Sequence, residues 1–385
     1  MPTPLIRAEI DLGAIAHNVR ELRRITSSSA QLMIAVKADG YGHGAVRIAQ
    51  TVLQNGADSL AVARAEEGLE LRKAGIGAPV LILGYTAGHW ADTLVAEQLV
   101  PTIFSLQNAR EFSAEAVSKK AKIPIHIKID TGMGRLGIPC NELRAPGDNG
   151  AIQEILEIDR LPGISIEGLY THFATADHAD KTYADQQFDR FTALVAALES
   201  HGMTLPLLHA ANSGAIIDMP HTHLDLVRAG ISVYGLYPSQ EVARDRIDLR
   251  PALELKSTII HLKHVPAGAK ISYGCTYETD APTTIATIPA GYGDGYSRRL
   301  SNCAPALVHG RRVPLVGRVC MDLSMVDVGP VDDAAVGDEV VLIGRQGDAF
   351  ITADEVADLL GTINYEVVTA LTQRVSRVYI TSPDG

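Results

Sequence analysis

The sequence lacks several features that would place it in a special class of protein. It has only four cysteines in 385 residues and no C-x-x-C pair, which argues against a disulfide-rich scaffold and favours thiols in a reducing compartment. No apolar run reaches the length of a membrane span, and no apolar signal-peptide segment follows Met1. We therefore expect a cytoplasmic protein that has no membrane as a partner.

Basic residues are scarce relative to acidic ones. The 34 lysines and arginines face 45 aspartates and glutamates, which gives a net charge of −11 at pH 7. Such a chain is a poor general partner for nucleic acid or for an anionic membrane surface. Hydrophobic residues make up 46% of the chain, which is ample for a large core and argues against disorder.

What is present is an alternation of strand-like and helix-like segments. Eight apolar runs are typical of buried strands: residues 31–36, 59–62, 80–83, 100–103, 125–129, 164–170, 207–210 and 226–229. Helical patterns are clearest at residues 12–25, 45–54, 64–73, 106–121, 152–159 and 180–201. Eight strand–helix units in about two hundred residues predict a (β/α)8 TIM-type barrel, although a doubly wound sheet would use the same units.

The pattern changes near residues 238–251. Beyond this point, short β-rich pieces are separated by glycine and proline, at residues 253–264, 284–288, 311–319, 323–328 and 339–343. One helical pattern, residues 353–360, interrupts them. We expect two domains: a barrel over residues 10–240, and a mostly-β domain over residues 241–385 with which residues 1–9 pack.

Lys37 stands at the end of the first predicted strand, inside the glycine-rich stretch AVKADGYGHG at residues 35–44. Burial lowers the pKa of a lysine and makes its neutral, nucleophilic amine available. The glycines allow the backbone to approach a ligand closely. The local pattern alone fits equally well with an exposed lysine before a tight turn.

Other polar residues follow the first strand or later strands at the same end, where barrels have their active sites. They are Tyr41, Lys128, Arg135, His172, Asn212, Ser213 and Arg228. Ser213, Gly230 and Ile231 lie on the loops after the seventh and eighth strands, where barrels often bind phosphate. A lysine amine and a phosphate site in one barrel mouth suggest a Schiff-base aldolase or a pyridoxal-phosphate enzyme.

Motifs along nearly the whole chain resemble those of alanine racemases. They are AVKADGYGHG (35–44), KIDTGMGRLG (128–137), YTHFA (170–174), SYG (272–274), AGYGDGY (290–296), GRVCMD (317–322) and INYE (363–366). The resemblance implies a barrel plus a β domain in a head-to-tail homodimer with shared active sites. It also implies pyridoxal 5'-phosphate as cofactor and the interconversion of L- and D-alanine, which supplies D-alanine for peptidoglycan.

The resemblance further implies a mechanism with two bases on opposite faces of the substrate α-carbon. Lys37 would bind the cofactor covalently and, once released, act on one face. Tyr273 from the second subunit would act on the other face, linked to His172 and through it to Arg228. Arg228 would also meet the cofactor's pyridine nitrogen.

The resemblance also implies roles for the remaining site residues. Cofactor contacts would come from Tyr41, Asn212, Ser213, Gly230, Ile231 and Tyr365. Arg135 and the Met321 backbone N–H would bind the substrate carboxylate, and Tyr292 and Tyr365 would crowd the side-chain pocket. Lys128 matches a position that is often carbamylated, which would let it orient Arg135.

Several other patterns have weaker interpretations. Residues 132–137 fit G-x-G-x-x-G, but Pro139 follows and no helix opens, so we expect no dinucleotide. His221 and His223 have no third ligand nearby, and a solvated loop is favoured over a metal site. A barrel-type decarboxylase using Cys320 and a non-catalytic cofactor carrier are the alternative functions. The insertion at residues 141–149 has no assigned role.

Overall fold

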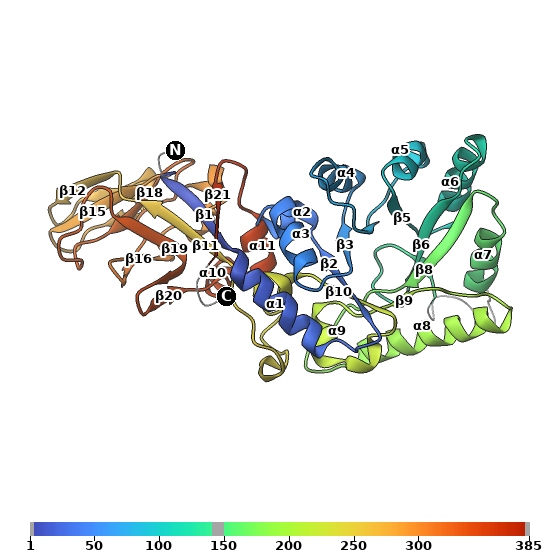
Figure 1. Cartoon of the computed structure of the whole chain (residues 1–385). Coiled ribbons are helices and arrows are strands. Elements are labelled where there is room, and N and C mark those ends of the chain that lie inside the picture. Colours follow the sequence, from blue (N-terminus) through green and yellow to red (C-terminus); the bar gives the residue numbers. More distant parts are fainter. Residues whose placement is uncertain (1–3, 141–149, 382–385) are drawn as a thin grey trace. The chain divides into compact units, whose positions relative to one another are not determined.

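The computed structural model describes residues 4–140 and 150–381, so the insertion at 141–149 lies outside the described residues (Figure 1). The chain divides into two compact units. The barrel unit comprises Ala14–Gly40 and Ala45–Arg250, and the β unit comprises the residues up to Gly13, Tyr41–Gly44 and the residues from Pro251 onward. Within the described ranges, no helix is both long and apolar enough to cross a membrane.

Eight parallel strands form the barrel, and all but the two-residue β9 are rich in buried aliphatic residues. They are β2 (Gln31–Ala35), β3 (Ser59–Val62), β4 (Val80–Ile82), β5 (Leu99–Ile103), β6 (Ile123–Asp130), β8 (Ile164–Tyr170), β9 (Leu208–His209) and β10 (Leu226–Ala229). The last strand, β10, pairs with the first, β2. Backbone bonds from Asp225 N to Leu208 O (3.1 Å) and from Arg228 N to Ala211 O (2.9 Å) join β9 to β10. This closure confirms the predicted barrel and excludes an open doubly wound sheet.

Helices follow most of these strands along the chain (Figure 1). They are α3 (Ala45–Gln54), α4 (Ala65–Lys73), α5 (Ala91–Ala96), α6 (Leu106–Ser118), α7 (Gly150–Asp159), α8 (Thr182–Ser200) and α9 (Ser213–Asp218), and α1 (Leu12–Ile25) precedes the first barrel strand. The longest, α8, buries Phe191, Leu194, Val195 and Leu198 on one face, the spacing of an amphipathic helix.

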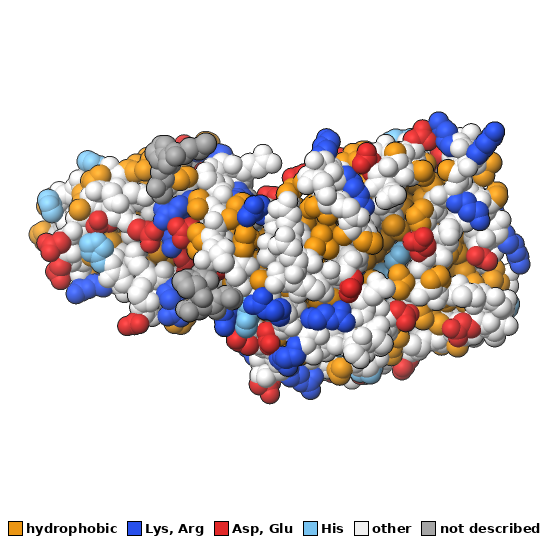
Figure 2. Space-filling model, in the orientation of Figure 1, with side chains coloured by type: hydrophobic (Ala, Val, Ile, Leu, Met, Phe, Trp, Pro, Cys, Tyr) orange, Lys and Arg blue, Asp and Glu red, His pale blue; other side chains and the backbone are white. Residues whose placement is uncertain are grey.

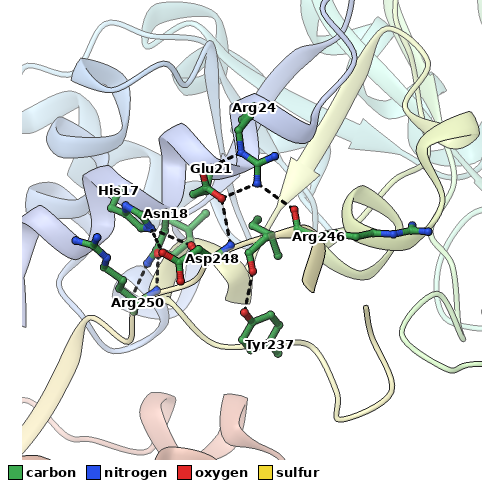
Figure 3. A network of polar contacts seen from close by, with 10 residues as sticks. His17, Asn18, Glu21, Arg24, Tyr237, Arg246, Asp248 and Arg250 are labelled. Atoms are coloured by element: carbon green, nitrogen blue, oxygen red, sulfur yellow. Dashed lines mark hydrogen bonds and ion pairs between the residues drawn. The ribbon is translucent and has the colours of Figure 1, made fainter. Parts of the chain in front are cut away.

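Polar contacts tie α1 to the chain segment that leaves the barrel (Figure 3). The Asn18 side chain donates to the carbonyl oxygen of Arg250 (2.8 Å) and accepts from its N–H (2.8 Å). Glu21 accepts from Arg24 at 2.7 Å and from the Asp248 N–H at 3.1 Å. The Arg24 bonds, with the Asp248 N–H, lower the pKa of Glu21 to about 2, so this network is ionised at neutral pH.

The β unit is mostly β, as predicted. Its larger sheet has the order β17-β16-β19-β11-β1-β21, with β20 paired to β19. The strands are β1 (Ile6–Asp11), β11 (Leu253–Thr258), β16 (Pro305–Val308), β17 (Arg311–Pro314), β19 (Glu339–Gln346), β20 (Ala349–Ile351) and β21 (Ser376–Ile380). β1 pairs antiparallel with β11 and parallel with β21, so it is an internal strand of this sheet, next to the edge strand β21.

Smaller elements complete the β unit. One three-stranded sheet contains β12 (His261–Val265), β15 (Thr283–Ile288) and β18 (Ser324–Asp327), and a short hairpin pairs β13 (Lys270–Ile271) with β14 (Tyr277–Glu278). Two helices, α10 (Ala353–Leu360) and α11 (Asn364–Thr369), follow. Figure 2 shows acidic and basic side chains interspersed on the visible face, so the excess negative charge does not form one patch there.

Candidate active site

Lys37 follows β2 and opens a turn with an unusual backbone. The segment α2 (Lys37–Tyr41) has φ and ψ near +50° at Ala38 and Asp39, and φ is also positive at Gly40 and Tyr41. A left-handed turn costs roughly 1–2 kcal/mol for each residue other than glycine. Strain of this kind persists only where the surroundings enforce it, and it is concentrated at functional sites.

Two carboxylates hold this turn in place. Glu67, on α4, accepts hydrogen bonds from the Ala38 N–H at 2.7 Å and the Ala63 N–H at 2.6 Å. Asp39 accepts from the Ala45 N–H at 2.9 Å, which connects the turn to the start of α3. Glu67 was not among the residues predicted from the sequence, because nothing local distinguishes it from other surface glutamates.

The electrostatic environment favours a neutral lysine amine. Burial lowers the pKa of Lys37, and the nearby Arg135 cation lowers it further. Burial likewise lowers the pKa of Lys128 to about 8, with further contributions from Arg135 and Arg228. The barrel mouth therefore concentrates positive charge, which suits an anionic ligand.

Arg228, on β10, is at the centre of a buried hydrogen-bond network. Only 6% of the residue is exposed. One Nη donates to His209 Nδ1 at 2.8 Å, and the other donates to Thr171 O at 2.7 Å and approaches His172 Nδ1 at 3.3 Å. A guanidinium has only donors, so both Nδ1 atoms must accept. Burial and the Arg228 charge lower the pKa of both histidines well below the usual value, which keeps them neutral.

The network continues to a second buried histidine. Because His209 Nδ1 accepts, its proton is on Nε2, which donates to His126 Nδ1 at 2.8 Å. The Tyr170 ring stacks on His209 with centroids 4.6 Å apart, and the Arg228 guanidinium lies over the same ring. A Cβ at Gly168 would lie 2.6 Å from His126 Nδ1. None of these neighbours of Arg228 was predicted.

The predicted phosphate loops lie together in the barrel unit. The Gly230 N–H donates to Ser213 Oγ at 2.8 Å, which joins the loops after β9 and β10. Asn212 caps α9 by accepting from the Ala215 N–H at 3.1 Å. Ile231 is buried directly after Gly230.

The predicted residues of the β unit form two groups. The rings of Tyr41 and Tyr365 lie 6.2 Å apart. The loops of Tyr292 and Met321 are joined by backbone bonds, including Gly293 N to Met321 O at 2.8 Å. Tyr273, Tyr292 and Met321 are all exposed in the single chain, and Tyr273 is the most exposed at 69%.

The structure explains the G-x-G-x-x-G pattern at residues 132–137 and the position of His223. Asp130 accepts hydrogen bonds from Gly132 and Gly134, and the strand β7 (Ile138–Pro139) rather than a helix follows this glycine-rich loop. His223 is buried, with Nδ1 accepting from the Ser27 N–H and Nε2 directed at Ile216 O. The expectation of a solvated loop is therefore wrong for His223, whose two nitrogens have structural partners.

A closed parallel barrel followed in the chain by a mostly-β unit, with the partly buried Lys37 after the first barrel strand, is the architecture of a barrel-type enzyme. Comparison with known proteins narrows this class. The model "Alanine racemase, N-terminal domain" matches residues 10–238, and "Alanine racemase, C-terminal domain" matches residues 252–379. The chain belongs to the alanine racemase family, and its enzyme class is that of an amino-acid racemase, not a decarboxylase or a non-catalytic carrier.

Individual relatives agree with this assignment. The chain is 52% identical to the alanine racemase of Desulfosudis oleivorans, covering 97% of this chain and 96% of the relative. It is 48% identical to that of Methanococcus maripaludis, with 97% and 98% covered. A solved alanine racemase of Clostridium difficile 630 has a TM-score of 0.93 at 40% identity, covering 99% of this chain and 97% of that one.

Proposed function

We propose that this chain interconverts L- and D-alanine with pyridoxal 5'-phosphate as cofactor and supplies D-alanine for peptidoglycan. The observation that supports this most directly is the Lys37 amine, which is held by a strained turn with its pKa lowered by burial and by Arg135. A neutral amine is what the cofactor aldehyde requires. When bound, the cofactor withdraws electrons from the substrate α-carbon.

The described residues fit this cofactor. Lys37 would hold its aldehyde carbon, and Ser213, Gly230 and Ile231 would hold its phosphate, because the hydrogen bond from the Gly230 N–H to Ser213 Oγ brings the two loops that carry them together. The family resemblance assigns Asn212, Tyr41 and Tyr365 to the cofactor as well. Arg228 would donate a hydrogen bond to the pyridine nitrogen.

Two bases would move the proton. The Lys37 amine takes or returns the α-proton on one face, and Tyr273 from the partner subunit does so on the other. His172 Nδ1 faces Arg228, so a neutral His172 has its proton on Nε2. That N–H would donate to the Tyr273 oxygen and stabilise it after it loses its proton.

Arg228 would determine the protonation of the cofactor ring. Burial lowers its pKa to about 10, so it remains a cation at neutral pH. As a permanent donor, Arg228 would leave the pyridine nitrogen unprotonated. This would weaken electron withdrawal and favour return of the proton to the α-carbon over transamination.

Arg135 and the Met321 N–H would bind the substrate carboxylate, and Tyr292 and Tyr365 would limit the side chain to a methyl group. Discrimination against one extra methylene is worth only about 1–3 kcal/mol. Slow side activity on serine is therefore expected.

Lys128 would be carbamylated. With its pKa lowered to about 8, its amine is neutral often enough to attack carbon dioxide, forming an N–C bond and releasing one proton. The resulting anion would pair with Arg135 and remove one cation from the crowded barrel mouth.

Circular dichroism tests the proposed reaction. Pure L-alanine should lose its optical signal without release of gas or keto acid, which separates racemisation from decarboxylation and transamination. Borohydride reduction followed by peptide mapping should place the cofactor on Lys37. Label on another lysine would contradict the proposal.

A further inference from the structure

Ser272, directly before Tyr273, has a backbone conformation that is almost reserved for glycine. Its φ is 65° and its ψ is −174°. This region is disfavoured for any residue with a Cβ atom. A serine held there must be stabilised by its surroundings.

The surroundings of Ser272 are rigid on one side. β13 and β14 close a hairpin around residues 272–276, with Ile271 paired to Tyr277. Ile271 is buried in a cluster with Ile285, Val316 and Met325. Ser272 therefore comes directly after Ile271, which is held by strand pairing and by core packing.

The Ser272 hydroxyl makes a hydrogen bond that stabilises the strained backbone of the same residue. Oγ donates to the Arg318 carbonyl oxygen at 2.6 Å and lies 3.6 Å from Cys320 Sγ. A Cβ at Gly317 would lie 2.7 Å from Ser272 Cβ and 2.9 Å from Ile271 O. The 317–318 segment thus packs closely against Ser272 and supplies its acceptor.

Asn302 links the 317–318 segment to the far end of the hairpin loop at Thr276. Its Oδ1 accepts from the Gly317 N–H at 2.5 Å, and its Nδ2 donates to Thr276 Oγ1 at 3.1 Å. The loop that contains Tyr273 is therefore bound at Ser272 and at Thr276, while the Tyr273 side chain between them is exposed.

The geometry points to Ser272 as a positioning residue for Tyr273. Its hydroxyl bond to Arg318 O holds the strained backbone, and that backbone sets the direction in which the Tyr273 side chain leaves the loop. The inference rests on the proposed role of Tyr273 as the second base, and it adds a residue that would act through Tyr273.

Two substitutions separate the hydroxyl bond from the backbone strain. Ser272→Ala removes the bond but keeps the Cβ, so the turn relaxes and Tyr273 is displaced. Ser272→Gly also removes the bond, but glycine adopts this backbone freely. We expect alanine to lower the racemisation rate by roughly tenfold, about 1.4 kcal/mol, and glycine to retain most of it.

Isotope effects show whether Tyr273 is the group affected. With Cα-deuterated alanine, one enantiomer gives its deuteron to Lys37 and the other to Tyr273. In Ser272→Ala the isotope effect should rise in the Tyr273 direction and fall in the opposite one, because only that proton transfer has slowed. A purely structural defect would change the amount of active enzyme and leave both isotope effects unchanged.

Thermal unfolding of the purified enzyme gives a second readout. Glycine normally lowers stability relative to alanine, but here Ser272→Gly should unfold about 2–4 °C above Ser272→Ala. Asp333, which is exposed with φ of 58°, is the matched control. Its alanine and glycine variants should differ in the same thermal order without altering either isotope effect.

The outcomes distinguish two failures. If Ser272→Ala matches the unmodified enzyme in rate and isotope effects while Tyr273→Phe is impaired, the role of Ser272 is overturned and the proposed function stands. If Tyr273→Phe is itself unimpaired, the two-base proposal fails. An equal loss in the alanine and glycine variants would also overturn the positioning role.

Discussion

At the scale of single residues, Arg228 determines which of its neighbours donate and which accept hydrogen bonds. It can only donate hydrogen bonds, so His209 and His172 must accept from it. The N–H of His209 then donates a hydrogen bond to His126. The pKa of each of these histidines is lowered by burial and by the Arg228 charge. The neighbouring histidines are therefore neutral and accept hydrogen bonds, so Arg228 remains the cationic donor of this network.

Replacing this donor with an acceptor should change which product forms. In Arg228→Glu, a carboxylate opposite the pyridine nitrogen would favour its protonation and strengthen electron withdrawal. The ratio of pyruvate formed to alanine racemised should rise roughly tenfold or more. The ratio is independent of how much variant enzyme folds. Arg228→Lys, which stays a donor, is the control, and an unchanged ratio in the glutamate variant would count against the role of Arg228.

Lys128 should make stability depend on pH. Its pKa is about 8 in the folded chain against 10.5 as the reference value, so between these pH values the unfolded state binds more protons. The free energy of unfolding should therefore rise with pH from 8 to 10.5, by about 3 kcal/mol, and this contribution should be absent below pH 8.

Urea unfolding in bicarbonate-free buffer at pH 7.5 and pH 10 measures this difference, with Lys128→Met as the reference. The two proteins should diverge as the pH rises, and parallel curves would contradict the assignment. Bicarbonate should flatten the dependence, because a carbamylated amine no longer titrates in this range.

The positions of Lys37 and Arg228 at the carboxyl end of the barrel strands could be predicted because each stands at the end of an apolar run. His126 and Gly168 could not, although each lies two positions before a recognisable residue, Lys128 and Tyr170 respectively, on β6 and β8. Alternate residues of a strand face the same side, so this spacing was a usable signal. However, the contact between Gly168 on β8 and His126 on β6 joins residues that are far apart in the sequence, so the spacing alone does not reveal it.

At the scale of elements, the barrel was predictable because its strands are buried on both faces. Runs such as SLAV in β3 are fully buried, and parallel strands of this kind appear in sequence as continuous apolar segments. The six-residue helices α5, α9 and α11 were not predicted, since fewer than two helical turns give too little periodicity.

The β unit was predictable in class but not in pairing. Residues 253–264, expected as one piece, form β11 and β12 in two different sheets. β1 pairs with β11, whose residues lie nearly 250 positions later in the chain. No local pattern reports a partner at that distance.

The β8 strand should tolerate no side chain at Gly168. A Cβ there would lie within 2.7 Å of two His126 ring atoms, although the Gly168 backbone is not left-handed. Gly168→Ala should therefore lower the free energy of unfolding by about 1–3 kcal/mol through steric overlap alone. Urea unfolding measures this loss.

Gly77→Ala is the matched control for this substitution, because nothing lies within 4 Å of its Cβ position and its φ is not positive. It should be neutral or slightly stabilising. Equal stability of the two alanine variants would show that His126 can move aside without loss.

At the scale of the whole molecule, the exposed Tyr273, Tyr292 and Met321 fit the proposed homodimer, in which each β unit completes the other subunit's site. Such an interface is isologous, so each dimer contains two equivalent composite sites. Lys37 and Tyr273 of any one site then come from different chains.

Mixing two inactive variants tests this arrangement most directly. Lys37→Ala and Tyr273→Phe should each be nearly inactive alone. After subunit exchange at equal concentrations, half of the dimers are mixed and each has one intact site, so about a quarter of the unmodified activity should return. No recovery, despite mixed dimers shown by native mass spectrometry, would mean that Lys37 and Tyr273 do not act across the interface.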